Sequence, residues 1–209
     1  MCGAADTIHE RGAMSKTVRV VVLVFVLGGS AFAAWKLRRG RTVEDVVAGR
    51  PTPSSRDLTL VAFKEERRLE VWVDGRLERT FAILGASGGA GPKRREGDLQ
   101  VPEGIYRLTT LNPESRHHLS IRVDYPDAED RRLGFTGGDI YVHGGSASIG
   151  CIAIGNDAVE EVFRLAAKAA NRRILIVPWD LRRRSAPSTS EPWLAARYER
   201  LKHELPVIP

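Results

Sequence analysis

The chain has 209 residues, of which 43% are hydrophobic and 28% are charged, and it carries a formal net charge of +6 with a pI near 9.7. A basic balance raises nucleic acid as a partner. However, the positive residues are spread along the chain and often stand beside acids, as in KEERR, KRREGD and DAEDRR. No aromatic-rich basic face or nucleic-acid-binding motif stands out, so we expect no nucleic-acid partner.

Residues 1–39 are predicted to be a signal peptide or a membrane anchor. An uncharged apolar run extends over Val20–Trp35 and follows two basic residues. A signal-peptide core needs about 7–15 apolar residues and a full bilayer span about 20, so the run suits either role. Ala31–Ala33 fits the small-x-small pattern of a cleavage site, and a chain begun at Met14 has the proportions of an ordinary signal peptide.

Basic residues crowd the far side of this run: Lys36, Arg38, Arg39 and Arg41. Such a cluster is unusual after a cleavage site and favours a retained anchor. By the positive-inside tendency, however, the same basic residues oppose export of the segment that follows. A short buried helix is the alternative interpretation, but nothing polar marks a second face. We predict export to the periplasm or cell envelope and leave open whether the segment is cleaved or anchors the protein to the inner membrane.

Residues 40–56 are rich in Arg, Pro, Ser and Gly without an apolar period, which predicts a linker. Residues 57–180 have the length of one globular domain. An Asp-Gly turn within Val73–Arg76 predicts a β-hairpin. Strands are predicted by runs of β-forming residues, namely LTLVAF, LEVWV, RTFAIL, YRLTTL, LSIRVDY, DIYVHG and RILIVPW.

One helix is predicted after residue 156. Asp157 and Glu160 form a capping-box pattern, and Asn171 can end the helix. The apolar residues at helical spacing are Val159, Val162, Phe163, Ala166, Ala167 and Ala170. Since no βαβ alternation is present, the fold class is mostly β (β+α), with one helix packed against a sheet or barrel.

Residues 181–209 are predicted to be a tail beyond this domain. LRRRSAPSTS is basic and then rich in Ser and Pro, which indicates a linker. EPWLAARYERLKHEL can form a short amphipathic helix, which would cover a groove, touch the membrane or fray.

The segment HGGSASIGC, His143–Cys151, holds one of only two cysteines in the chain, the other being Cys2. In an oxidising compartment structural cysteines pair, so a folded domain with one thiol has no internal disulfide. A lone cysteine is then either a small buried hydrophobe or a nucleophile.

As a nucleophile, Cys151 needs a base to make its thiolate, and His143 is the nearest candidate. The small residues between them allow the chain to fold back, and the N–H groups of Gly150 and Cys151 can point at an oxyanion. The imidazole also needs an orienting acceptor, either a backbone carbonyl such as that of Gly144 or a Ser hydroxyl. The alternative is a glycine hairpin with a strand-end His and a buried Cys.

A metal site is not expected. Two ligands in one loop fall short of the three or four that zinc uses. The other histidines, His9, His117, His118 and His203, show no ligand spacing. Either His117 or His118 can approach the loop from the preceding strand. We expect no cofactor.

HGGSASIGC resembles the signature of the L,D-transpeptidase catalytic domain family of the YkuD type, in which His-Gly or His-Ser precedes a Ser-x-Gly-Cys motif. Gly91–Leu108, GPKRREGDLQVPEGIYRL, resembles the family's Gly-Asp and Thr-Pro-x-Gly-x-Tyr/Phe block. HLSIRVDYPDAEDR and GGDIYVHG are similar to the narrower YafK-like branch of murein enzymes. The resemblance spans Leu58–Trp179 and implies an L,D-transpeptidase-like β-sandwich or barrel with one helix following the catalytic Cys loop.

The resemblance implies that Cys151 is the acyl-forming nucleophile and His143 the general acid/base. Gly144 matches the position that orients the histidine, and Ser148 and Gly150 match the fixed Ser and Gly before the cysteine. Departures from the common pattern are Ile149 in place of His, Ala153 in place of Arg or Asn, and Val101 in place of Thr. The YafK-like branch shares Ser-Ile-Gly-Cys, so these changes suggest a subclass.

The resemblance further implies an enzyme of cell-wall biogenesis and cell shape that forms an acyl-enzyme on the peptidoglycan stem peptide, at meso-diaminopimelate. Transfer to an amine would make it an L,D-transpeptidase. Hydrolysis by the same thiol, of a cross-link or of the amide between murein and an outer-membrane lipoprotein, would make it an amidase. Two other hypotheses are a non-catalytic peptidoglycan-binding anchor and a cysteine hydrolase acting on proteins.

Overall fold

The computed structural model describes residues 56–208. The predicted signal peptide or anchor, and the predicted linker apart from residue 56, lie outside the described residues. Within residues 56–208 there is no helix with the length and apolar character needed to cross a membrane.

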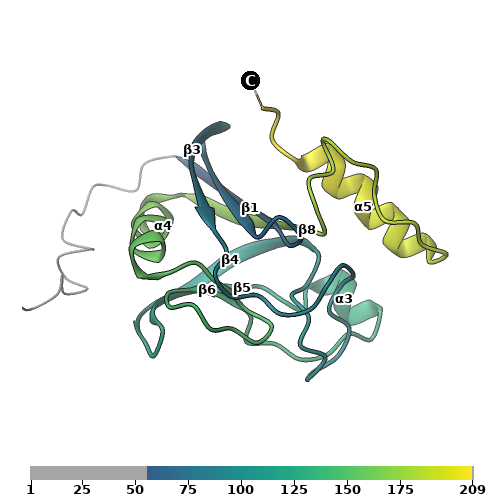
Figure 1. The fold of residues 1–209 in the computed structure, drawn as a ribbon, viewed down its shortest axis with the longest axis horizontal. Coiled ribbons are helices and arrows are strands. Elements are labelled where there is room, and N and C mark those ends of the chain that lie inside the picture. Colours follow the sequence, from purple (N-terminus) through teal and green to yellow (C-terminus); the bar gives the residue numbers. More distant parts are fainter. Residues whose placement is uncertain (1–55, 209) are drawn as a thin grey trace, which may run out of the picture. The chain divides into compact units, whose positions relative to one another are not determined.

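The strands form a curled sheet in the order β3-β2-β1-β8-β4-β5-β6-β7, with few helices (Figure 1). The predicted mostly-β fold is confirmed. The bounds are β1 Asp57–Phe63, β2 Arg68–Val73, β3 Arg76–Ala82, β4 Gly104–Ser115, β5 His118–Val123, β6 Tyr141–His143, β7 Ile152–Ala153 and β8 Asn171–Val177.

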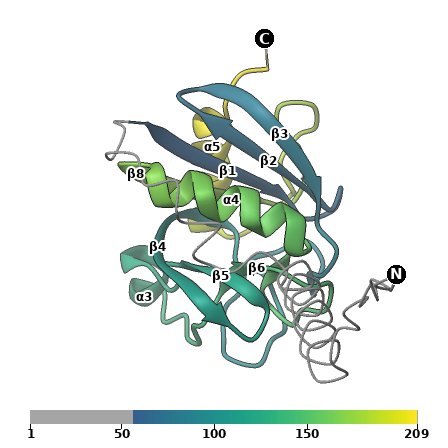
Figure 2. The ribbon, with the colours of Figure 1, turned by 90° about the vertical axis from the view of Figure 1, so that its left-hand side faces the viewer.

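The long strand β4 joins the two halves of the sheet. Gly104–Arg107 pairs with β8, whereas Leu108–Ser115 pairs with β5 through two register shifts. Irregular pairing increases local twist, so the sheet turns along β4 and brings β5, β6 and β7 under the first half (Figure 2). The short strands β6 and β7, which carry the loop of interest, lie at the far edge of the second half.

The predicted hairpin at Val73–Arg76 is confirmed. Asp74 and Gly75 have φ angles of 50° and 76°, as a two-residue type I′ turn requires, and Val73 pairs with Arg76 between β2 and β3.

The predicted helix is α4, Asn156–Lys168, which buries Val159, Val162, Phe163 and Ala166. The predicted capping box is wrong, because the N-cap is Gly155, at a φ of 84°, and has no side-chain cap. The predicted end at Asn171 is also wrong. The Ala170 N–H donates to the Arg56 carbonyl, and Asn171 begins β8 beside β1, so sheet pairing ends the helix earlier.

Sequence analysis missed helix α3, Ala128–Arg132. Its capping box is real: the Asp130 N–H donates to Asp127 and the Asp130 carboxylate accepts from the Asp127 N–H. The helix is only five residues long, so it has no hydrophobic period to reveal it.

The packed unit extends past residue 180, the expected boundary of the domain. Helix α5, Pro192–Glu204, lies on the face of the sheet opposite α4 (Figures 1 and 2). The predicted short helix is therefore present, but as part of the core. The buried residues it shares with the sheet are Val61, Phe63, Trp72, Leu175, Val177, Leu194, Tyr198, Leu201 and Leu205.

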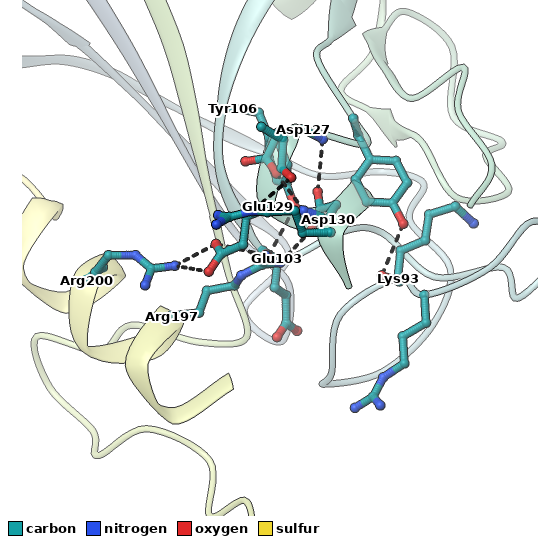
Figure 3. A network of polar contacts seen from close by, with 12 residues as sticks. Lys93, Glu103, Tyr106, Asp127, Glu129, Asp130, Arg197 and Arg200 are labelled. Carbon is teal, nitrogen blue, oxygen red and sulfur yellow. Dashed lines mark hydrogen bonds and ion pairs between the residues drawn. The ribbon is translucent and has the colours of Figure 1, made fainter. Parts of the chain in front are cut away.

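A buried polar network fastens α5 to the segment that leads into β4 (Figure 3). The Glu103 carboxylate, fully buried, accepts from Lys64 Nζ at 3.0 Å, from the Gly91 N–H at 2.8 Å and from the Tyr198 hydroxyl at 2.7 Å. Arg197 donates to Asp130 at 2.8 Å and to the Glu103 carbonyl at 3.1 Å. These bonds join Lys64, directly after β1, to α3, α5 and residues 91–103.

We expect Leu201→Ala to lower the free energy of unfolding by about 2–5 kcal/mol, because Leu201 is fully buried between α5 and the sheet. Lys202→Ala, on the exposed side of the same helix, should stay within about 0.5 kcal/mol of wild type. Urea unfolding checks both variants. Equal stabilities for the two would show that α5 is not part of the cooperative unit.

Candidate active site

His143 and Cys151 are brought together by two short parallel strands. His143 ends β6 and pairs with Ala153 of β7, and Cys151 directly precedes β7. Since side chains alternate along a strand, Cys151 is on the same side of the pairing as Ala153 and His143. Both residues line one cavity of about 440 Å³.

The His143 ring is held by the carbonyl of its own neighbour. Nδ1 lies 2.6 Å from the Gly144 oxygen, and the residue is only 3% exposed. A carbonyl can only accept, so Nδ1 carries the hydrogen and Nε2 is left as an acceptor. Burial lowers the pKa of His143 below its ordinary value, and the bond to Gly144 opposes this only in part.

The Cys151 thiol is half-buried, and its Sγ lies 3.4 Å from the Asp139 carbonyl oxygen. Burial raises the pKa of Cys151 above its ordinary value, partly offset by the backbone of Tyr141. Both shifts disfavour the charged forms. They favour a neutral thiol and a neutral imidazole in the same cavity, the protonation pattern that general-base activation of a thiol starts from.

The two N–H groups predicted to face an oxyanion are already bonded. The Gly150 N–H donates to Ser87 Oγ at 2.7 Å and the Cys151 N–H to Ser148 Oγ at 3.1 Å. Both N–H groups therefore have a serine hydroxyl as acceptor in this structure, and their role toward an oxyanion stays a prediction. Ser148 therefore holds the backbone of Cys151 through its hydroxyl, and its supporting role stays a prediction.

Ser87 was missed by sequence analysis. It belongs to the segment that pairs with β7 through Gly85, whose N–H and carbonyl both bond Ala153. A Cβ on Gly85 would lie 2.4 Å from the Ser146 oxygen, so only glycine lets this segment lie against the Cys loop. The run GASGGAG, 85–91, is as rich in small residues as the Cys loop, and this composition was the available signal.

Of the two neighbouring histidines, the structure brings His117 to the site. The His117 and His143 ring centroids are 4.4 Å apart, and His117 lines the same cavity as Cys151. His118 instead contacts α4, with Nε2 2.8 Å from Glu160.

The positions that depart from the common family pattern have different surroundings. Ile149 is 75% exposed, so the residue that stands in place of the usual His points to solvent. Ala153 and Val101 are buried. The other residues that line the cavity have polar side chains: Asn112, Glu114, Ser115, Arg116, Ser120, Asp139 and Tyr141. Residues 56–208 contain no group of three or more His, Cys, Asp or Glu side chains suited to a metal ion.

The chain matches the L,D-transpeptidase catalytic domain family, YkuD, over residues 57–176, and it belongs to that family. Among curated proteins it is 39% identical over 113 residues to YafK of Escherichia coli K12, a protein named for L,D-transpeptidase activity. The match covers 51% of this chain and 46% of YafK, so the chain spans about half the length of that relative.

Among solved structures the chain resembles the helical cell shape determining protein Pgp2 from Campylobacter jejuni. The sequence identity is 21% and the TM-score 0.51, over 67% of this chain and 56% of Pgp2. A mutant of Pgp2 gives the same TM-score at 22% identity. This likeness supports the fold.

Gly144→Ala should disturb the site directly. The added Cβ would lie 2.5 Å from the His117 carbonyl and 2.7 Å from Asn156 Oδ1. The end of β6 would therefore have to move away from the β4–β5 hairpin that carries His117. We expect a destabilisation of about 1–3 kcal/mol in thermal unfolding. Gly89→Ala, where a Cβ meets nothing within 4 Å, is the control and should match wild type. A stable Gly144→Ala protein would contradict this packing.

The neutral pair predicts the pH dependence of Cys151 alkylation by iodoacetamide. Because burial raises the thiol pKa, the rate should keep increasing above pH 8.5, the region where an ordinary thiol titrates. The reaction is followed by mass spectrometry on the peptide that contains Cys151, beside a model cysteine peptide. A rate that is already constant near pH 6 would instead indicate a thiolate–imidazolium pair.

Proposed function

We propose that this chain is an exported, cysteine-dependent peptidoglycan enzyme of the cell envelope. Cys151 attacks the stem peptide at meso-diaminopimelate and forms an acyl-enzyme. The acyl group is then transferred to an amine. The observation that supports this most is the shared cavity of Cys151 and His143, with the imidazole tied through Nδ1 to Gly144, in a chain of the L,D-transpeptidase family.

In the acylation step, Nε2 of His143 takes the proton of the Cys151 thiol while Sγ attacks the carbonyl at the L-centre of diaminopimelate. The C–S bond forms and the carbonyl oxygen becomes an oxyanion. When the C–N bond breaks, His143 returns the proton to the departing amine and a thioester remains. In the second step His143 takes a proton from the incoming amine, whose nitrogen attacks the thioester carbonyl. The C–S bond then breaks, and His143 returns the proton to the departing thiolate, which restores the thiol.

The oxyanion would replace a serine hydroxyl. Ser87 Oγ and Ser148 Oγ accept the N–H bonds of Gly150 and Cys151, so each hydroxyl marks a position that an acceptor oxygen can occupy. We propose that substrate binding displaces one of these hydroxyls and frees its N–H for the oxyanion. Gly150, at a φ of 80°, has the backbone freedom for such an adjustment.

Hydrolysis is the second candidate, with the murein–lipoprotein amide or a cross-link as the bond cleaved. It is favoured by the charged side chains that line the cavity, Glu114, Arg116 and Asp139, which are compatible with water beside the thioester. Water would then replace the amine in the second step. Transfer and hydrolysis use the same residues and differ only in the acceptor.

The acyl-enzyme can be sought by intact-protein mass spectrometry of the full-length chain incubated with purified disaccharide tetrapeptide or with lipoprotein-bearing muropeptides. Wild type should gain the mass of the acyl group, and Cys151→Ala should not. Ser146→Ala, at an exposed position of the same loop, is the control and should keep the adduct. The released products distinguish transfer from hydrolysis.

Absence of adduct and product with both substrates would contradict the proposal. If wild type and Cys151→Ala then bound sacculi equally, the non-catalytic anchor would be the better description. Cleavage of all-L peptides, with no preference for diaminopimelate-containing stems, would instead favour a general cysteine hydrolase.

A further inference from the structure

The hairpin between β4 and β5 places a second imidazole against the first. The planes of His117 and His143 are inclined by 36° with centroids 4.4 Å apart, which is within the range of aromatic pair contacts. His143 is buried and His117 is exposed at the cavity wall. His117 is not among the loop residues that the family resemblance assigns to the reaction.

The position of His117 is set by several contacts of the hairpin. The His117 N–H donates to Ser115 Oγ at 3.2 Å, and its carbonyl accepts from Leu119 N–H at 3.0 Å. The same carbonyl lies where a side chain on Gly144 would be, so the hairpin and the His143–Gly144 backbone are in close contact.

The next residue fastens the hairpin from behind. His118 has a φ of 73°, and its ring contacts Glu160 of α4 at 2.8 Å. Consecutive residues thus point to different partners, one to α4 and one to His143. An exposed ring on a free hairpin would sample many positions, whereas this hairpin is anchored on both sides.

We propose that His117 is a positioning residue for the proposed reaction, whose ring holds the His143 imidazole in the orientation that keeps Nε2 available to Cys151. The bond from Nδ1 to Gly144 fixes one edge of the ring, and the contact with His117 restrains rotation about that edge. This inference rests on the proposed function of Cys151 and His143.

The electrostatics of His143 support the same assignment. Burial is the main cause of its lowered pKa, and the neighbouring His117 lowers this pKa further, which favours the unprotonated base. The other charged or titratable groups around the pair are Glu114, Arg116, Asp139, Tyr141 and Cys151 in the cavity, with His118 and Glu160 behind the hairpin and Arg122 paired to Asp139.

Two substitutions separate the ring contact of His117 from its effect on the His143 pKa. His117→Ala removes the ring contact, and we expect acylation of Cys151 by the tetrapeptide to slow roughly three- to ten-fold at pH 8. His117→Phe keeps a ring, so the rate at pH 8 should stay within about two-fold of wild type. Because His117→Phe removes the neighbouring group that lowers the His143 pKa, this pKa should rise and the acidic limb of the pH–rate profile should move to higher pH.

The measurements use the full-length chain, with His203→Ala on the exposed side of α5 as the matched histidine control. Acylation rates come from mass spectrometry, and the His143 pKa comes from NMR titration of ¹⁵N-labelled histidines. The NMR titration needs no substrate. If wild type forms neither an acyl-enzyme nor a product, the proposed function fails, while the titration still reports whether His117 acts on His143.

The proposal is overturned if His117→Ala leaves both the rate and the titration at wild-type values. It is also overturned if His117→Phe is as slow as His117→Ala at pH 8, since the ring contact would then be irrelevant. A thermal unfolding midpoint that matches wild type shows that the variants are folded.

Discussion

The arrangement of the segments around β4 depends on the hydrogen bonds that the buried Glu103 carboxylate accepts. A buried charge is costly unless it is paired and hydrogen-bonded, and Glu103 meets this condition through donors from three separate segments: Lys64, Gly91 and Tyr198. Lys64 directly follows β1, Gly91 lies in the loop before β4, and Tyr198 belongs to helix α5. Because one carboxylate accepts all three bonds, helix α5 and the loop that contains Gly91 are fixed by the same buried group.

That fixed frame brings four chain segments together at one edge of the sheet. The parallel pairing of β6 and β7 sets His143 beside Cys151, the small residues around Gly85 pack against the Cys loop, and the β4–β5 hairpin adds His117. Each close approach requires a missing side chain, at Gly85 in one case and at Gly144 in another. The abundance of glycine near the site therefore follows from backbone packing as well as from space for a substrate.

The electrostatics of the site follow from its burial. His143 bonds a neutral carbonyl at Nδ1, so the imidazolium gains less stabilisation there than a carboxylate would give, and the thiol is also desolvated. A pair of this kind rests in its neutral form and needs the developing charge of a transition state to move the proton. Under the proposed function, catalysis would then depend on how the imidazole is held and on which N–H groups the substrate frees.

The sequence by itself determined the strand pattern, the Asp-Gly hairpin, the amphipathic helix and the presence of one thiol and one imidazole in the HGGSASIGC loop, because these depend on residues close together in the chain. The boundaries of α4, the choice of His117 over His118, the engagement of Gly150 by Ser87 and the packing of α5 were decided only by the tertiary structure. Each depends on a contact between distant segments, such as Ala170 with Arg56 or Tyr198 with Glu103. Local patterns record which side chains are apolar or reactive, but the partners that satisfy a buried backbone or carboxyl group are set by the packing of the whole chain.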